Sequence, residues 1–347
     1  MVRRHQDTGL ALAIGIVSGF IGWAIQMPLP WMLGPMIGTT LAALVGLPVR
    51  GPGKLRPYVV PVIGVLLGSA ITPDLFDRLG TWTLTILLLP LFLALAAAVS
   101  FVIYRRLGRY DPVTAFYSAM PGGLNEMLIL GEAAGGDARK IALAHAARIL
   151  IVVTLVVIYF GYVLDVKSGA DGNGVVPLDM ITPKNGIILL ACAVIGVFAG
   201  KRLRLPAATI FGPMILSGWV HLMGWVEIAP PTLLVIIAQI VIGTVIGARF
   251  VGSTPRQIAR DLGVAAVASG AMLVVALGCA ELIAYSQGIP LSQAFLAYSP
   301  GGLTEMSLLT LALGQDIAYV SVMHIVRIAL VIAVAPATSR LILRRMS

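Results

Sequence analysis

Long runs of hydrophobic residues dominate the chain, and polar positions are confined to short stretches between them. Residues 81–104 and 141–164 form two such runs with few charged side chains. A helix rises about 1.5 Å per residue, so runs of this length match a bilayer core of about 30 Å. The pattern predicts ten membrane-spanning helices, at 9–26, 30–47, 57–73, 81–104, 140–164, 187–200, 207–224, 231–249, 263–286 and 317–339.

Two further segments, 111–136 and 290–315, contain near copies of one motif. Pro-Gly-Gly-Leu-Asn-Glu-Met occupies 121–127 and Pro-Gly-Gly-Leu-Thr-Glu-Met occupies 300–306, an offset of 300 − 121 = 179 residues. A helix-breaking motif inside otherwise apolar sequence, repeated in both halves of a chain, is typical of secondary transporters.

The duplication extends beyond this motif. Identical residues recur at offsets of 178 or 179: Phe116 and Phe295, Asp137 and Asp316, His145 and His324, Arg148 and Arg327, and Gly-Pro-Met at 34–36 and 212–214. The sequence therefore predicts two membrane repeats, 1–164 and 187–347, joined by an external linker at 165–186.

The basic residues predict how the chain is oriented. Arg3 and Arg4 assign the N-terminus to the cytoplasm, because short cytoplasmic loops carry an excess of Lys and Arg. The basic cluster at 201–204 lies in the cytoplasm only if 111–136 enters and leaves the membrane on one side. The same reasoning for 290–315 keeps the C-terminus cytoplasmic. We expect an all-α integral membrane protein with one re-entrant hairpin per repeat, a broken helix that crosses fully being the alternative. Five spans per repeat is an odd number, so the repeats are expected to be inverted.

The composition supports the membrane assignment. Apolar residues make up 59% of the chain and charged residues 11%, and the mean hydropathy is +0.97. A soluble domain has roughly 25% charged residues. The net charge of +9 arises from basic residues between the spans, so it indicates orientation rather than a nucleic-acid partner. Cys192 and Cys279 both fall within predicted spans, which gives no disulfide framework.

The Pro-Gly-Gly motifs expose backbone groups at membrane depth. Proline lacks an N–H, and glycine reaches backbone angles closed to other residues. The free N–H groups of the helix that begins after the motif favour an anion, whereas the freed carbonyls can ligate Na⁺. The candidate solute-binding backbone consists of Pro121, Gly122, Gly123, Pro300, Gly301 and Gly302.

Glu126 and Glu305 follow the second glycine of each motif by three residues. One interpretation is a carboxylate that caps its own helix. The other is a site for a coupling H⁺ or Na⁺, because an ionised carboxylate at that depth is expensive and usually functional. Asn125 and Thr304 precede the two glutamates and offer uncharged oxygen ligands, and their difference indicates that the two sites are not equivalent.

His145 and Arg148 lie three residues apart on one helix face, as do His324 and Arg327. A membrane-buried arginine must face the protein interior and find a partner. Two alternatives are open for each arginine: an ion pair with the nearby glutamate, or a clamp for an anionic solute. Each histidine either relays protons or hydrogen-bonds a neighbouring carbonyl. All four are candidate solute-binding residues.

Several chemistries are not indicated. The chain has no phosphate-binding P-loop, and its four histidines form no cluster with cysteine that would suit an oxygen-activating metal. No nucleophile and base stand together. The sequence therefore predicts no enzyme and no cofactor, apart from Na⁺ as a candidate coupling ion.

The paired PGGLxEM motifs, the HxxRI motifs after them and the repeated Gly-Pro-Met resemble the AbrB family of bacterial membrane proteins over essentially the whole chain. Members of that family are labelled as ammonia monooxygenases or as regulators of gene expression. The family is also distantly similar to inverted-repeat carriers of the cation/proton antiporter and anion transporter group. The resemblance implies a multi-pass protein of the bacterial inner membrane, in contact with lipid and capable of forming a homodimer.

These patterns lead to one main hypothesis and one alternative. The main hypothesis is a secondary active transporter of a small anionic or polar solute, coupled to H⁺ or Na⁺ through the two glutamates. The alternative is a membrane-embedded regulator of gene expression that moves no solute.

Overall fold

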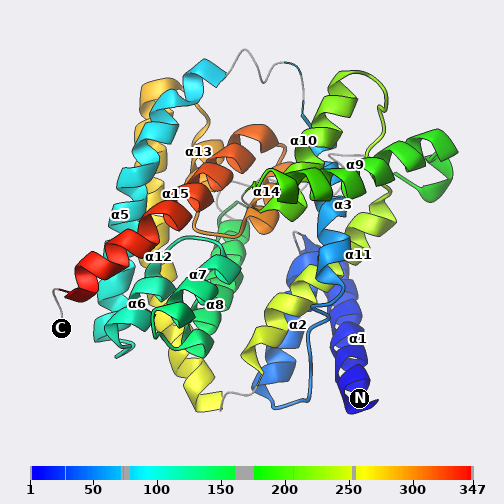
Figure 1. Cartoon of the computed structure of the whole chain (residues 1–347). Helices are drawn as coiled ribbons and strands as arrows, with labels where there is room; N and C mark the ends of the chain where they lie inside the picture. The colour runs from blue at the N-terminus through cyan, green and yellow to red at the C-terminus, as the bar shows by residue number, and fades with distance from the viewer. Residues whose placement is uncertain are drawn as a thin grey trace. The chain divides into compact units, whose positions relative to one another are not determined.

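The computed structural model describes residues 2–27, 29–71, 73, 79–160, 176–205, 207–251 and 255–344. Within these ranges the protein contains fourteen α-helices, three short 3-10 helices and no strand (Figure 1). Seven helices in the described part are long and apolar enough to cross a membrane. The predicted all-α, membrane-type fold is confirmed at this level.

The chain forms two compact units, each of which draws on both halves of the sequence. Unit 1 comprises Met1–Leu79, Val157–Gly252 and Ser307–Ala318. Its main helices are α1 (Val2–Ala24), α2 (Pro30–Leu44), α3 (Arg56–Ser69), α9 (Pro183–Arg202), α10 (Ala208–Leu222) and α11 (Thr232–Gly247).

Helices of unit 1 approach one another closely at glycines. Gly34 on α2 lies against the carbonyl oxygen of Ser18 on α1, and a Cβ at Gly34 would overlap that oxygen. Gly212 on α10 lies in the same way against the carbonyl oxygen of Gly196 on α9, and both residues of this contact follow their counterparts by 178. The two helix pairs are therefore packed by the same contact.

Unit 1 also joins helices from different halves of the chain. α3 packs on α10, and α11 packs on α2. Gly64 on α3 contacts the carbonyl oxygen of Ile210, and Gly243 on α11 contacts that of Met32. Gly64 and Gly243 are 179 residues apart, and Met32 and Ile210 are 178 apart. The contact of α3 with α10 is therefore equivalent to that of α11 with α2.

Helices α2, α3, α10 and α11 of unit 1 are shorter than their predicted spans. α2, α3 and α10 contain 15, 14 and 15 residues, which is about 22 Å of helix. The helix α2 begins after Leu29 and is followed by Gly46, both of which have a positive φ. Apolar residues continue beyond such turns, so hydropathy alone overestimates these helices. All ten predicted spans nevertheless coincide with helices.

Unit 2 comprises Gly80–Val156, Ser253–Met306 and Tyr319–Ser347. It holds most or all of α5 (Thr83–Arg106), α6 (Pro112–Ala119), α7 (Leu124–Ala133), α8 (Ala138–Ile158), α12 (Pro255–Gln287), α13 (Leu291–Tyr298), α14 (Leu303–Ala312) and α15 (Ile317–Arg344). The later part of α14 and the start of α15 belong to unit 1.

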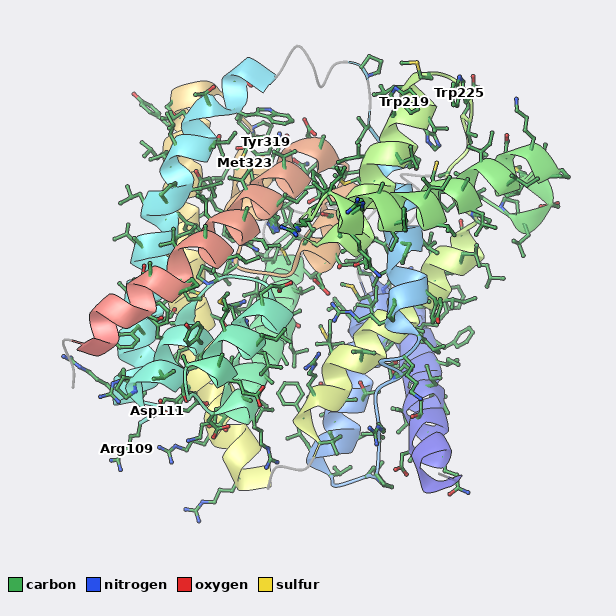
Figure 2. The ribbon with its side chains drawn as sticks, in the orientation of Figure 1. Arg109, Asp111, Trp219, Trp225, Tyr319 and Met323 are labelled. Carbon is green, nitrogen blue, oxygen red and sulfur yellow. The ribbon has the colours of Figure 1, made fainter. Side chains whose placement is uncertain are left out.

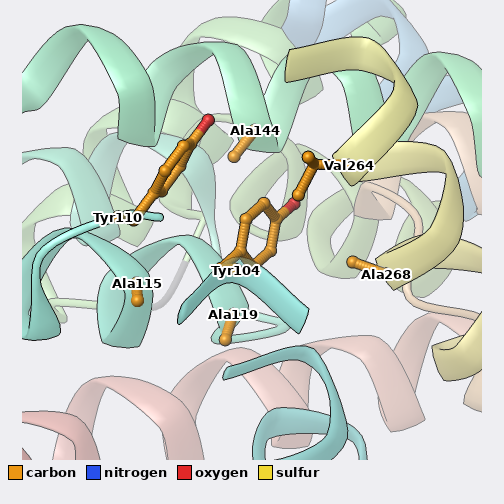
Figure 3. Packing of buried hydrophobic residues seen from close by; sticks show 7 residues of the cluster. All are labelled: Tyr104, Tyr110, Ala115, Ala119, Ala144, Val264 and Ala268. Carbon is orange, nitrogen blue, oxygen red and sulfur yellow. The ribbon is translucent and has the colours of Figure 1, made fainter. Parts of the chain in front are cut away.

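One apolar cluster of unit 2 fixes the start of α6. Tyr104 near the end of α5 stacks on Tyr110 with ring centroids 5.4 Å apart, and Ala144 of α8 and Val264 of α12 pack against the pair (Figure 3). Buried aromatic rings contribute large apolar contact areas. The cluster therefore anchors the first broken helix to three longer helices.

The segments predicted as hairpins, 111–136 and 290–315, each form two short helices separated by a break. α6 and α7 hold 8 and 10 residues, as do α13 and α14. Each short helix is about 12–15 Å long, roughly half the thickness of a bilayer core.

The linker predicted at 165–186 lies partly outside the described residues, which resume at Val176. Val176 N donates to Thr232 Oγ1 at 2.9 Å, and Thr232 N donates to Val176 O at 3.0 Å. The described end of the linker is therefore tied to the first turn of α11.

Candidate functional site

The first break separates α6 from α7. α6 begins after Asp111 (Figure 2), whose carboxylate accepts a hydrogen bond from Thr114 N at 2.9 Å, as an N-cap residue does. Partial burial raises the pKa of Asp111, but the hydrogen bonds from Thr114 together with those from the main chain of Asp111 and Val113 outweigh this effect, so the pKa lies below its ordinary value. After Ala119 the backbone is extended at Met120 and again at Gly123, where α7 begins.

The break leaves carbonyl groups that a side chain must satisfy. Pro121 has no N–H, and neither Met120 O nor Gly122 O accepts a hydrogen bond from a described main-chain N–H outside the helices. Arg148 on α8 supplies the donors: Nη1 donates to Met120 O at 2.8 Å, and Nη2 to Gly122 O at 3.2 Å. Its side chain is 3% exposed. The guanidinium therefore replaces the missing main-chain donors.

His145 holds this guanidinium from the same helix. Its Nε2 lies 2.9 Å from the carbonyl oxygen of Tyr117, which can only accept, so Nε2 carries the proton. Nδ1 is then an acceptor, and Arg148 Nη2 donates to it at 3.0 Å. Both ring nitrogens of His145 are thus engaged with protein groups, and its described contacts position Arg148.

The second break, between α13 and α14, has the same framework. Arg327 on α15 donates from Nη1 to Ser299 O at 2.6 Å and from Nη2 to Gly301 O at 2.7 Å. His324 Nε2 lies 3.1 Å from Leu296 O. Each of these donors and acceptors follows its counterpart by 179 residues, as in 327 − 148 and 301 − 122. The two breaks are therefore built by equivalent contacts.

Three buried nitrogens at the breaks have no hydrogen-bond partner in the described structure. They are Nε of Arg148, Nε of Arg327 and Nδ1 of His324. Arg327 is 2% exposed and His324 is 0% exposed. Buried polar atoms are normally paired, and the exceptions mark strain, a bound species or a functional role.

Both glutamates lie over the start of their own helix. A Cβ added to Gly123 would overlap Oε2 of Glu126, and a Cβ added to Gly302 would overlap Oε2 of Glu305. Each carboxylate therefore lies directly over the glycine that precedes its helix, and the position is favourable because the helix N-terminus carries partial positive charge. Glu305 is 4% exposed, whereas Glu126 is partly exposed, so the two carboxylates differ in burial.

The remaining candidates lie beside these groups. Pro121 and Pro300 are buried, and Thr304 is 5% exposed in the first turn of α14. The side chain of Asn125 lies outside the described part of the structure. Among the described residues, no three His, Cys, Asp or Glu side chains gather in a way that could hold a metal ion.

Each arginine makes main-chain contacts that neither of its two alternatives, the ion pair with a glutamate or the clamp for an anionic solute, included. The Nη atoms of Arg148 and Arg327 bind main-chain carbonyls, and no ion pair from either arginine to a glutamate is present among the described residues. The reason is local, because each break leaves two carbonyls within reach of the guanidinium. The histidines follow the alternative in which Nε2 binds a neighbouring carbonyl.

Sequence reasoning missed a polar contact at the second break. Tyr298, the last residue of α13, donates to Thr85 O at 2.7 Å, and Thr85 Oγ1 lies 3.0 Å from the hydroxyl of Tyr319. Neither tyrosine has a counterpart at the offset of 179, where the chain has Ala119 and Lys140. That mismatch in an otherwise repeated segment is the signal that identifies them.

The fold and the two breaks define a helical protein of the integral-membrane class. The chain belongs to the AbrB family, whose model, described as "Transition state regulatory protein AbrB", matches residues 31–343. It is 25% identical to "Putative regulator AbrB" of Escherichia coli (strain K12), over 95% of this chain and 94% of that protein. It is also 25% identical to "Uncharacterized protein YhjN" of Bacillus subtilis (strain 168), over 95% and 92%. The family predicted from the paired motifs is confirmed.

Proposed function

We propose that the protein is a secondary active transporter of a small anionic or polar solute, coupled to H⁺ or Na⁺ through Glu126 and Glu305. One observation carries the proposal: two broken helices, equivalent in the two halves, each combine a buried arginine with a carboxylate at a helix start. Irregular backbone at membrane depth is tolerated only inside protein or beside a water-filled cavity. Interrupted helices in corresponding positions are the strongest sequence pointer to a transporter's binding site.

The proposed architecture is a pair of inverted repeats in the bacterial inner membrane, with both termini in the cytoplasm and the breaks in re-entrant hairpins. Its support is the repetition of packing contacts at constant offsets, in which α1 to α3 correspond to α9 to α11. The distribution of basic residues supports the orientation. Alternating access follows if one element rocks against another around the breaks.

The arginine contacts favour H⁺ over Na⁺ as the coupling ion. The break carbonyls that were candidates for ligating Na⁺ already accept hydrogen bonds from a guanidinium, which carries a permanent positive charge. A sodium ion at those oxygens would have to compete with this tethered cation. The two carboxylates remain as groups that can bind a proton.

Replacing Na⁺ by choline is therefore expected to change transport less than twofold, whereas an imposed proton gradient drives it. The measurement is uptake into liposomes reconstituted with the purified protein, under a Na⁺ gradient alone and a pH gradient alone. A solute must first be found by its effect on thermal stability, since a ligand at 100 times its Kd stabilises the native state by about 2.7 kcal/mol. Uptake driven by Na⁺ without a pH gradient would rule out proton coupling.

Glu126→Gln and Glu305→Gln test the carboxylates. Glutamine keeps the length and the oxygen over each helix start but cannot ionise, so folding is expected to survive while solute-induced proton movement falls at least tenfold. Thr304→Val, beside Glu305, separates loss of the charge from loss of a neighbouring hydroxyl. Proton movement at the wild-type rate in both glutamine variants contradicts the assigned role.

The second candidate function is a membrane-embedded regulator of gene expression, which the family description and the name of the Escherichia coli relative favour. Under this function the arginine and glutamate side chains are static parts of the fold, and no solute stabilises the protein. The regulatory function would be favoured over transport if carboxylates, amines, Na⁺ and changes of pH left the melting temperature unchanged in the wild type and in both glutamine variants. Neither function requires an enzymatic reaction, and none is proposed.

A further inference from the structure

The two breaks share a framework but differ at one nitrogen. In the first break, Nδ1 of His145 accepts a hydrogen bond from Arg148. In the second break, Nδ1 of His324 has no partner, although the ring is fully buried. The second break therefore has an unused hydrogen-bond acceptor that the first break lacks.

The difference follows from where each guanidinium lies. Arg327 holds its two carbonyls at 2.6 and 2.7 Å, whereas Arg148 holds its carbonyls at 2.8 and 3.2 Å and shares Nη2 with the histidine. The guanidinium of Arg327 is thus committed to the break and leaves the imidazole alone. Because Nε2 of His324 faces a carbonyl oxygen and must carry the proton, its Nδ1 is an unfilled acceptor.

The surroundings have diverged in the same direction. Ser321, His324 and Arg327 recur every three residues, so they share one face of α15, and their exposed fractions are 0%, 0% and 2%. The corresponding row on α8 begins with Ala142 instead of serine. At the break itself, buried Ser299 takes the place of Met120. The second break is the more polar and the more deeply buried of the two.

We propose that the second break is the solute-binding one, and that the solute is a small hydroxycarboxylate. Arg327 Nε–H donates to a carboxylate oxygen, and Nδ1 of His324 accepts a hydrogen bond from the hydroxyl on the neighbouring carbon. The first break is its structural counterpart. This inference rests on the transport function proposed above.

The geometry suits one small molecule. The two unfilled groups lie three residues apart on one helix face, which places their side chains as neighbours. In the first break, Nη2 of Arg148 lies 3.0 Å from Nδ1 of His145, so a guanidinium and an imidazole at this separation along a helix can approach each other. A 2-hydroxycarboxylate carries an anionic acceptor and a hydroxyl donor on adjacent carbons, so it complements an N–H and a lone pair at this spacing. A carboxylate without the hydroxyl group accepts the hydrogen bond from Arg327 Nε–H but offers no donor to Nδ1 of His324.

The test compares acids that differ by one hydroxyl. The probes are lactate against propionate and malate against succinate, and their binding to the purified full-length protein is measured by calorimetry or thermal shift. Wild type is expected to bind the hydroxylated member of at least one pair about tenfold more tightly, because one hydrogen bond to a buried acceptor is worth about a factor of ten.

His324→Gln removes only the proposed contact. Its side-chain amide nitrogen can take the place of Nε2 and donate to Leu296 O, but nothing replaces Nδ1, so the preference for the hydroxylated acid is expected to fall below twofold. The matched control is His145→Gln, which deletes the same atom from the first break and should retain the preference. Arg327→Lys, which keeps the charge but loses Nε–H, should weaken both members of a pair alike.

The outcomes separate the two proposals. Equal binding of hydroxylated and plain acids by wild type, or loss of the preference in His145→Gln as much as in His324→Gln, overturns the assignment to the second break and leaves transport standing. A buried water as the sole occupant gives the first of these results. If His324→Gln does not fold, the wild-type comparison of the acid pairs decides. Failure of every acid, amine and ion to bind removes the transport function itself.

Discussion

Arg327→Met should destabilise the folded protein by on the order of 3 kcal/mol. The replacement keeps much of the apolar stem but removes the donors to Ser299 O and Gly301 O, which lie at 2.6 and 2.7 Å in a buried site. A buried carbonyl left unpaired costs about 1–3 kcal/mol, and this variant leaves two. The measurement is equilibrium unfolding of the purified protein in mixed micelles.

The control for this variant is Arg109→Met. Arg109 is exposed in the turn between α5 and α6 (Figure 2), so its replacement should change stability by less than about 0.5 kcal/mol. Equal stability of the two variants would show that the guanidinium does not support the break. A large loss for Arg327→Met alone would establish the carbonyl contacts as the main structural role of the arginine.

Gly212→Ala is expected to destabilise the protein more than any other glycine-to-alanine change in unit 1. The free energy of unfolding should fall by about 3 kcal/mol. Its Cβ would overlap the carbonyl oxygen of Gly196, and a main-chain atom cannot rotate away as a side chain can. Gly34→Ala should behave alike, because its Cβ would overlap Ser18 O. Unfolding in mixed micelles again reports the change.

Gly270→Ala supplies the comparison for this substitution. A Cβ at Gly270, in the middle of α12, has no atom within 4 Å, so alanine should leave stability unchanged or raise it slightly through its better helix propensity. If Gly212→Ala and Gly270→Ala have equal effects, the close approach of α9 and α10 contributes nothing to stability.

The sequence predicted the positions of the helices better than their ends or their partners. Hydropathy placed a helix at 30–47, yet α2 ends at Leu44, because the αL turn at Gly46 is set by backbone geometry while apolar residues continue. The packing of α3 against α10 brings together residues that are far apart in the sequence, such as Gly64 and Ile210. The periodicity within one helix carries no information on such pairs. The repeated Gly-Pro-Met at 34–36 and 212–214 indicated the duplication but not these partners.

At the candidate site, too, the sequence predicted the position of the helix breaks better than the contacts that stabilise them. The breaks were predicted because proline and paired glycines interrupt a helix. The repeated Asp137 caps the start of α8, since its carboxylate accepts hydrogen bonds from Arg139 N and Lys140 N at 3.0 and 3.1 Å. The main-chain partners of the arginines were not among the two alternatives considered, and the clamp for an anionic solute stays a prediction. Every residue has a main-chain carbonyl, so the amino-acid sequence does not indicate which carbonyls accept hydrogen bonds from an arginine. A glutamate side chain, in contrast, can be recognised in the sequence as a candidate partner.

The arginine contacts have a mechanical consequence. Each guanidinium ties a broken helix to the long helix that follows it, α8 in the first case and α15 in the second, through two charge-assisted hydrogen bonds. Sliding either broken helix along its long helix by one helical turn, about 5.4 Å, would break both hydrogen bonds at once. The two short helices and the long helix after them are therefore expected to move as one rigid body, so the proposed transport cycle would have to bend the chain outside these groups.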